Sequence, residues 1–277
     1  MARALSAPSS TRPSVLRARR SLFLSYVVLT ALGAGVGFIA GDAFRLGPIG
    51  ADGAFLLERL QDGSVPFGPA VRAWIVGGIL MLLVSPFLQL SWLAELDRPE
   101  AGLSAALKRG AEGYLRAWGI ALAVGLVTAV SMAIVIAPGV IAAALAETER
   151  GESLALLSVA VPAALLLSAA LTWNDLARAE LSLQRATVRR SLASGLRAFG
   201  AKAWTLYLLS VVAARIVAFG GGTLAVMAGD GAIGVVAGAA LQLVVVLRLG
   251  IRGLWLAKTV TWIRSAPVDS PAPEPSP

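Results

Sequence analysis

The sequence predicts an all-α polytopic membrane bundle of six transmembrane helices in three pseudo-repeated hairpins, with cytoplasmic interfacial amphipathic helices. Three observations lead to this prediction. The 277 residues are 57% apolar and only 14% charged, whereas soluble domains are about 45–50% apolar and about 25% charged. Several apolar runs reach the length of about 18 residues that crosses a bilayer as a helix. A short motif and a tryptophan also recur at a nearly fixed interval, which indicates an internal repeat.

The repeat is clearest in a five-residue motif. The sequence LRAWG at 115–119 returns 81 residues later as LRAFG at 196–200, and each copy joins a basic amphipathic segment to an apolar run. Trp92, Trp173 and Trp255 are 81 and 82 residues apart, and each ends an apolar run. We therefore interpret the chain as three copies of one unit: a basic amphipathic helix, a membrane hairpin and a tryptophan at its exit.

We divide the chain into a disordered basic N-terminus (1–21), a six-helix membrane domain (22–264) and a disordered Pro-rich tail (265–277). At 1.5 Å per residue, about 20 helical residues cross a hydrocarbon core of about 30 Å. The third span is longer than this, so we expect it to tilt, to kink at Pro138 or to begin in the interface. The predicted spans are about 22–41, 71–93, 117–146, 153–173, 204–228 and 231–255.

The start of the chain has an alternative interpretation. A basic head before an apolar run is also the pattern of a cleaved signal peptide. We favour an uncleaved first span because its apolar run, about 19 residues, is longer than the 7–15 residues of a typical signal core.

The distribution of cationic residues predicts the orientation. The termini and the loops on their side of the membrane hold 17 Lys and Arg, against 4 in the opposite loops. By the positive-inside rule both termini are cytoplasmic. The high Ala, Gly and Arg content is typical of a GC-rich bacterial genome, so we expect the inner (cytoplasmic) membrane.

The predicted outer loops are short except for the first, at about 42–70, which contains a short apolar piece at 55–57. This loop contains an insertion of about 17 residues relative to the other two units. Each hairpin has an acidic residue where its first helix leaves the bilayer: Asp42, Glu147 and Asp230.

Two segments, 101–118 and 185–203, combine a helical apolar period with a basic face. We expect both to lie in the cytoplasmic interface and to contact anionic phospholipid headgroups. Their predicted basic contacts are Lys108, Arg109, Arg116, Arg189, Arg190 and Arg197. Indole is favoured at a membrane boundary, and the tryptophans expected at the cytoplasmic one are Trp92, Trp118, Trp173, Trp204, Trp255 and Trp262.

Three arginines, Arg215, Arg248 and Arg252, lie at or near membrane depth and are candidate anion or lipid ligands. No acid lies within any predicted span to pair with them. For Arg248 and Arg252 the competing interpretation is snorkelling, because Trp255 places them within two turns of the interface. Arg215 lies about 16 Å from Trp204 at helical rise, and for it an anion site and a structural role both remain open.

Several kinds of chemistry are excluded. The chain has no Cys and no His, which rules out thiolate nucleophiles, disulfides, His bases and Cys/His metal sites. We find no phosphate loop, nucleophile elbow or metal-ligand spacing, so we predict no catalytic residue, metal or cofactor. The net charge of +8 is placed beside apolar runs, which favours lipid over nucleic acid as partner. Pro86, Pro138 and Pro162 interrupt spans and are either functional kinks or ordinary membrane prolines.

The alternation of basic amphipathic helix, LRA(W/F)G motif and membrane helix resembles a loose group of uncharacterised bacterial six-helix integral membrane proteins. It is similar to the membrane domain attached to some glycerophosphodiester phosphodiesterases. The residues that carry the resemblance are 107–119 and 188–200. The soluble barrel with that family's catalytic residues is absent from this sequence, so the resemblance implies an architecture and no activity.

From these observations we predict a non-enzymatic integral membrane protein, a lipid-interacting or partner-docking module. Its partners would be the lipid bilayer, anionic headgroups and a membrane or cytoplasmic protein. The alternative is a small-solute or lipid transporter with its site near Arg215. An intramembrane enzyme that acts on lipid is the third hypothesis, and the lack of His and Cys makes it the least favoured.

Overall fold

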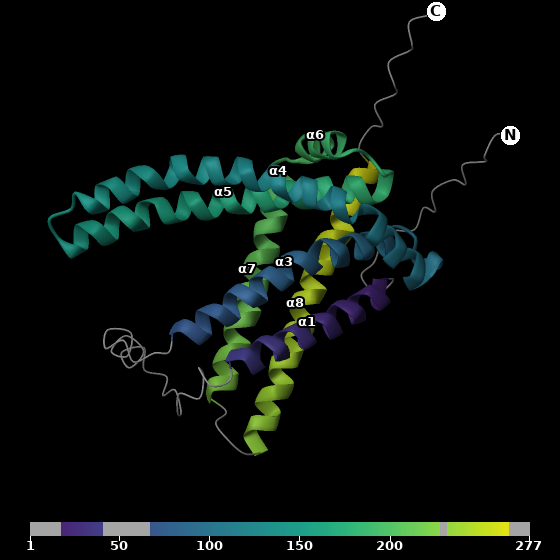
Figure 1. Ribbon diagram of the computed structural model, residues 1–277, viewed down its shortest axis with the longest axis horizontal. Coiled ribbons are helices and arrows are strands. Elements are labelled where there is room, and N and C mark those ends of the chain that lie inside the picture. The colour runs from purple at the N-terminus through teal and green to yellow at the C-terminus, as the bar shows by residue number, and fades with distance from the viewer. Residues whose placement is uncertain (1–17, 41–66, 228–231, 266–277) are drawn as a thin grey trace, which may run out of the picture.

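The computed structural model describes residues 18–40, 67–227 and 232–265, and over these residues the chain is all helical, without a strand (Figure 1). The all-α prediction is therefore confirmed. Over the described residues, each predicted span lies within one long helix, except that the third span ends two residues beyond α4. A 3-10 turn, η2 (Pro99–Ala101), joins α3 to α4. The helices are α1 (Arg19–Ala40), α3 (Phe67–Asp97), α4 (Gly102–Ala144), α5 (Glu149–Gln184), α6 (Val188–Ala198), α7 (Ala201–Met227) and α8 (Ala232–Ser265).

The membrane character is also supported by the helices. In the described part of the chain, three stretches are long and apolar enough to cross a bilayer: Ile75–Asp97, Pro99–Ala144 and Glu149–Gln184. A fourth would be α6 together with the first part of α7, if that bent pair counts as one span. Large apolar side chains on α4 and α7 face outward, as the 69% exposure of Ile134 illustrates, which suits a lipid environment. The full count of six spans stays a prediction.

The long helices pack as neighbours in sequence. α1 contacts α3, α4 contacts α5, and α7 contacts α8. In Figure 1 the α4–α5 hairpin extends to one side, while α7 and α8 run across it. The two helices of the α4–α5 hairpin approach closely at Gly139, where a Cβ would lie 2.4 Å from Cγ1 of Val159. Pro138 does not break α4, and Pro86 and Pro162 likewise lie inside continuous helices.

The core lies where the C-terminal halves of α3, α5 and α8 meet. Trp92 of α3 and Trp255 of α8 are each only 3% exposed. Trp255 packs edge-to-face on Tyr207 of α7 and on Trp262, with ring centroids 5.2 and 5.7 Å apart. Trp92 and Trp255 therefore lie in the core, and the position of the six tryptophans at the cytoplasmic boundary stays a prediction. Because three helix ends converge there, these indoles fill the space between helices instead of facing lipid.

A buried carboxylate fixes the start of α1. Glu95 of α3 is 1% exposed and accepts a hydrogen bond of 2.7 Å from the backbone N–H of Ser21. This N–H is in the first turn of α1, where no intrahelical acceptor is available and where the helix dipole favours a negative charge. α1 begins at Arg19, so residues 19–21 are helical although we placed the disordered terminus up to residue 21.

Some predictions fall outside the described residues. They include most of the basic N-terminus, the apolar piece at 55–57, the acids Asp42 and Asp230, and the tail beyond Ser265.

The two basic amphipathic segments differ, although their sequences are alike. Residues 102–118 are the first part of the continuous 43-residue helix α4. The second copy forms a separate helix, α6, and the chain turns by 91° between α6 and α7. The turn occurs at Phe199, whose ψ of 124° is extended. The first segment is thus not a separate helix, and the place of both segments in the cytoplasmic interface stays a prediction.

Contacts with α5 explain why α6 is separate. A Cβ on Gly195 would lie only 2.8 Å from the backbone N of Ala177, so α6 lies directly on α5. Trp173 of α5 donates its indole N–H to the carbonyl of Leu192 at 3.0 Å. The side chain of Thr187 accepts from the N–H of Arg190 and caps the first turn of α6. These contacts hold α6 against the end of α5, away from the axis of α7.

Candidate functional site

The centre of the molecule holds one carboxylate with four hydrogen-bond donors. Asp175 of α5 is 2% exposed. Arg252 of α8 binds it through both terminal nitrogens, Nη1 to Oδ2 at 2.5 Å and Nη2 to Oδ1 at 2.7 Å. Trp255 donates Nε1–H to Oδ2 at 2.8 Å, and Gln89 of α3 donates its amide N–H to Oδ1 at 2.8 Å. One side chain thus ties α3, α5 and α8 together.

A second arginine extends this network. Arg178, one turn beyond Asp175 on α5, is 7% exposed and donates Nη1–H to Oε1 of Gln89 at 2.6 Å. The Gln89 amide therefore bridges the carboxylate and a guanidinium, as a donor to one and an acceptor to the other. Nε of Arg178 is buried and has no hydrogen-bond partner among the described residues. We call Gln89, Asp175, Arg178, Arg252 and Trp255 the Asp175 network.

The Asp175 network corrects our statement that no acid is available to the membrane arginines. We ended the fourth predicted span at Trp173, but α5 continues to Gln184 and carries Asp175 into the core. Arg252 is therefore ion-paired and is not a free anion ligand.

Beside the network is a cavity of about 650 Å³ between α1, α3, α7 and α8. Leu29, Met81, Ala214 and Val245 form most of its apolar wall, with contributions from all four helices. Its polar wall comes mainly from α8, which supplies Gln242, Arg248 and Arg252, while α1 adds Thr30. We call this space the α8 cavity.

Two α8 side chains of the polar wall lie outside the Asp175 network. Gln242 accepts a hydrogen bond of 2.9 Å from the hydroxyl of Tyr26, which connects α8 to α1. Arg248 is exposed and, within the described residues, has no ion-pair partner. Snorkelling was the competing interpretation for Arg248 and Arg252. Arg252 instead pairs with Asp175, whereas Arg248 lines the cavity without an ion pair to a described residue.

Arg215 is not part of this wall. It is exposed on α7, and its neighbour Ala214 lines the α8 cavity while Arg215 does not. The described part of the chain offers it no ion pair. The structure therefore separates Arg215 from Arg248 and Arg252, which we had grouped as candidate ligands.

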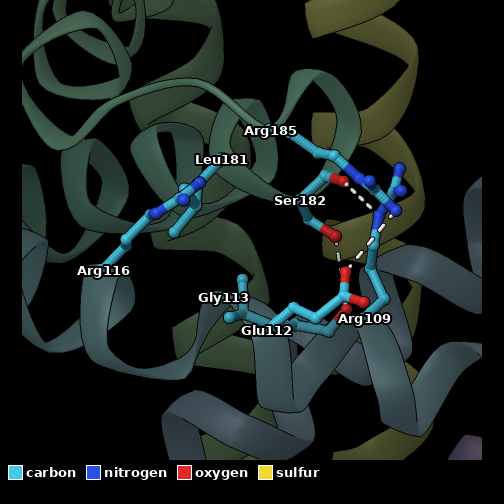
Figure 2. Close-up of a pocket in the computed structure, with 8 residues that line it drawn as sticks. Arg109, Glu112, Gly113, Arg116, Leu181, Ser182 and Arg185 are labelled. Atoms are coloured by element: carbon cyan, nitrogen blue, oxygen red, sulfur yellow. Dashed lines mark hydrogen bonds and ion pairs between the residues drawn. The ribbon is translucent and has the colours of Figure 1, made fainter.

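A second hollow lies where α4 crosses the end of α5, and Figure 2 shows its lining. Its volume is about 300 Å³. Arg109 donates Nε–H to the backbone carbonyl of Ser182 at 3.1 Å, and Arg185 lies 3.5 Å from the carboxylate of Glu112. We call it the Arg185 cleft. Its lining is Leu90, Arg109, Glu112, Gly113, Arg116, Leu181, Ser182 and Arg185.

The predicted interfacial cations thus fall into two groups. Arg109 and Arg116 line the Arg185 cleft, and Lys108 lines an adjoining hollow of about 250 Å³ that shares Arg109, Glu112 and Arg185. Arg189, Arg190 and Arg197 are exposed on α6 and line neither hollow. Sequence reasoning missed Asp175 and Arg178, because both lie beyond residue 173, where we ended the fourth span. It placed Arg185 at the start of the second amphipathic segment but did not predict it as a ligand.

Comparison with protein-family models, with curated proteins and with solved structures gives no match for this chain. The resemblance to the membrane domain of some glycerophosphodiester phosphodiesterases therefore stays a prediction.

Proposed function

We propose that the protein is a non-enzymatic integral membrane module that holds one anionic lipid in the α8 cavity. The observation that carries this proposal is the composition of the cavity wall. Apolar side chains from four helices line an open cavity of about 650 Å³, and its cationic groups are confined to α8. A pocket with an apolar wall and a few placed polar groups is the usual form of a small-molecule site, and here it matches acyl chains with an acidic headgroup.

Charge supports the same ligand. The Asp175 network contains two guanidinium groups, that of the buried Arg178 and that of Arg252, whose side chain is 36% exposed, and only one carboxylate. A charge of low exposure is costly unless it is paired. Arg248 adds a further positive charge at the same wall. An anionic headgroup placed between Arg248 and Arg252 would lower this cost and would accept charge-assisted hydrogen bonds.

The proposal places the protein in the inner membrane with both termini in the cytoplasm, as the cation distribution favours. Transport near Arg215 is the alternative. Because Arg215 lies away from the α8 cavity, single substitutions separate the two functions.

The test is lipid retention. The full chain is purified in a mild detergent, and retained phospholipid is counted by native mass spectrometry for the wild type and for Arg248→Ala. Loss of a charge-assisted hydrogen bond costs about 1.5–3 kcal/mol, which is roughly a tenfold or larger drop in affinity. We expect retained phosphatidylglycerol to fall accordingly, with no change in phosphatidylcholine.

Arg215→Ala is the matched control, since it removes an exposed membrane arginine from the neighbouring helix. It should retain lipid like the wild type. If Arg215→Ala loses lipid and Arg248→Ala does not, the α8 cavity is not the site and the transport alternative gains support.

A further inference from the structure

We propose that the Arg185 cleft is a second site, open to water, that binds a phosphate group. This proposal does not depend on the α8 cavity. It rests on the backbone of Arg185 and on the charges in the cleft.

The backbone of Arg185 is unusual for its residue type. Arg185 follows the last residue of α5 with φ of 53° and ψ of 32°, the left-handed conformation. Among the described residues it is the one non-glycine residue with positive φ. Glycine or asparagine is normally found at this position because a Cβ is crowded there. An arginine that keeps this conformation indicates that its side chain has a use.

The side chain of Arg185 reaches back over the cleft (Figure 2). It pairs with Glu112 at 3.5 Å, but both side chains remain substantially exposed, 63% for Arg185 and 45% for Glu112. A pair of this kind contributes little to stability, so the contact does not by itself explain the arginine.

The charges of the cleft suit an anion. Arg109, Arg116 and Arg185 surround one acid, Glu112, which leaves an excess of two positive charges. The C-terminus of α5 would oppose an anion through its dipole. Arg109 reduces this effect, because its Nε–H binds the terminal carbonyl of Ser182. Guanidinium groups are well matched to phosphate because they donate two parallel hydrogen bonds.

The phosphate group has two sources: a water-soluble phosphate, or the headgroup of an anionic phospholipid. In either source, phosphate oxygens would accept hydrogen bonds from Arg116 and Arg185. A soluble phosphate needs no apolar surface, whereas a headgroup must come from a lipid beside the cleft. The two are distinguished by changing the bilayer.

The test uses the full chain in nanodiscs of phosphatidylcholine, titrated with inorganic phosphate by calorimetry. The decisive variant is Arg185→Gly. Glycine fits the left-handed backbone, so the unfolding temperature should equal or exceed that of the wild type. Phosphate affinity should nevertheless fall about tenfold, as expected for loss of one charge-assisted contact. Glu112→Gln should bind phosphate more tightly, because it removes the one acid in the cleft.

Arg189→Gln is the control for overall charge, since Arg189 is exposed on α6 and lies outside the cleft. It should bind phosphate like the wild type. In nanodiscs with added phosphatidic acid, unchanged phosphate affinity indicates a soluble ligand, and weaker affinity indicates that the headgroup occupies the cleft. The proposal is overturned if inorganic phosphate does not bind in phosphatidylcholine nanodiscs, or if Arg185→Gly and Arg189→Gln reduce binding equally.

Discussion

Asp175 is the residue on which the packing of three helices depends. Its carboxylate accepts donors from α3 and α8 while it is itself part of α5. A buried ion pair with satisfied hydrogen bonds adds little relative to an apolar core, but removal of one partner leaves the other charge uncompensated. Removal of the Asp175 carboxylate should therefore lower the free energy of unfolding by much more than the net contribution of any one of its hydrogen bonds.

We expect Asp175→Asn to destabilise the protein by about 3–5 kcal/mol, because the buried guanidinium of Arg178 and the adjacent Arg252 would then lack the counter-charge of the network. Chemical or thermal unfolding in detergent measures this loss. Glu149→Gln, an exposed acid at the other end of the same helix, is the control and should have little effect. Equal stability of the two variants would show that the Asp175 network is not required for packing.

At the scale of elements, α6 shows how one close contact decides a helix direction. Its residues repeat the motif of α4, yet α6 lies on α5 because Gly195 has no side chain to hold the backbones apart. Gly200, which follows the turn, has open space around the position of a Cβ. We therefore expect replacement by alanine to destabilise the protein at Gly195 and to have little effect at Gly200.

Gly195→Ala should destabilise the protein by about 1–3 kcal/mol, the usual cost of overpacking. The added methyl would contact the backbone of Ala177, which cannot move without shifting α5. Gly200→Ala should leave the unfolding temperature nearly unchanged. If both variants have the same unfolding temperature as the wild type, α6 is not held by this contact.

At the scale of the whole molecule, the orientation in the membrane is the main prediction that cation counts alone support. The chain has no cysteine, so single introduced cysteines report accessibility without background. Ser104→Cys at the start of α4 and Lys202→Cys at the start of α7 should be protected from an impermeant maleimide in intact cells and labelled in opened cells. Both positions are exposed on the protein.

Ser64→Cys, in the long predicted outer loop, should be labelled in intact cells. Labelling of Ser104→Cys from outside would reverse the orientation. Labelling of Ser104→Cys and Lys202→Cys from opposite sides would contradict the three-unit repeat, because both begin the membrane part of a unit.

The sequence by itself determined the all-α class, the membrane character and the positions of the long helices. These follow from composition and from the length of apolar runs, which are local properties of the chain. Only the tertiary structure decided that Trp92 and Trp255 lie in the core, that α4 is continuous while α6 is separate, and that Arg252 pairs with Asp175. These features depend on which helices meet. Asp175 and Arg252 are 77 residues apart in the chain, and no local period reveals that their helices place them in contact.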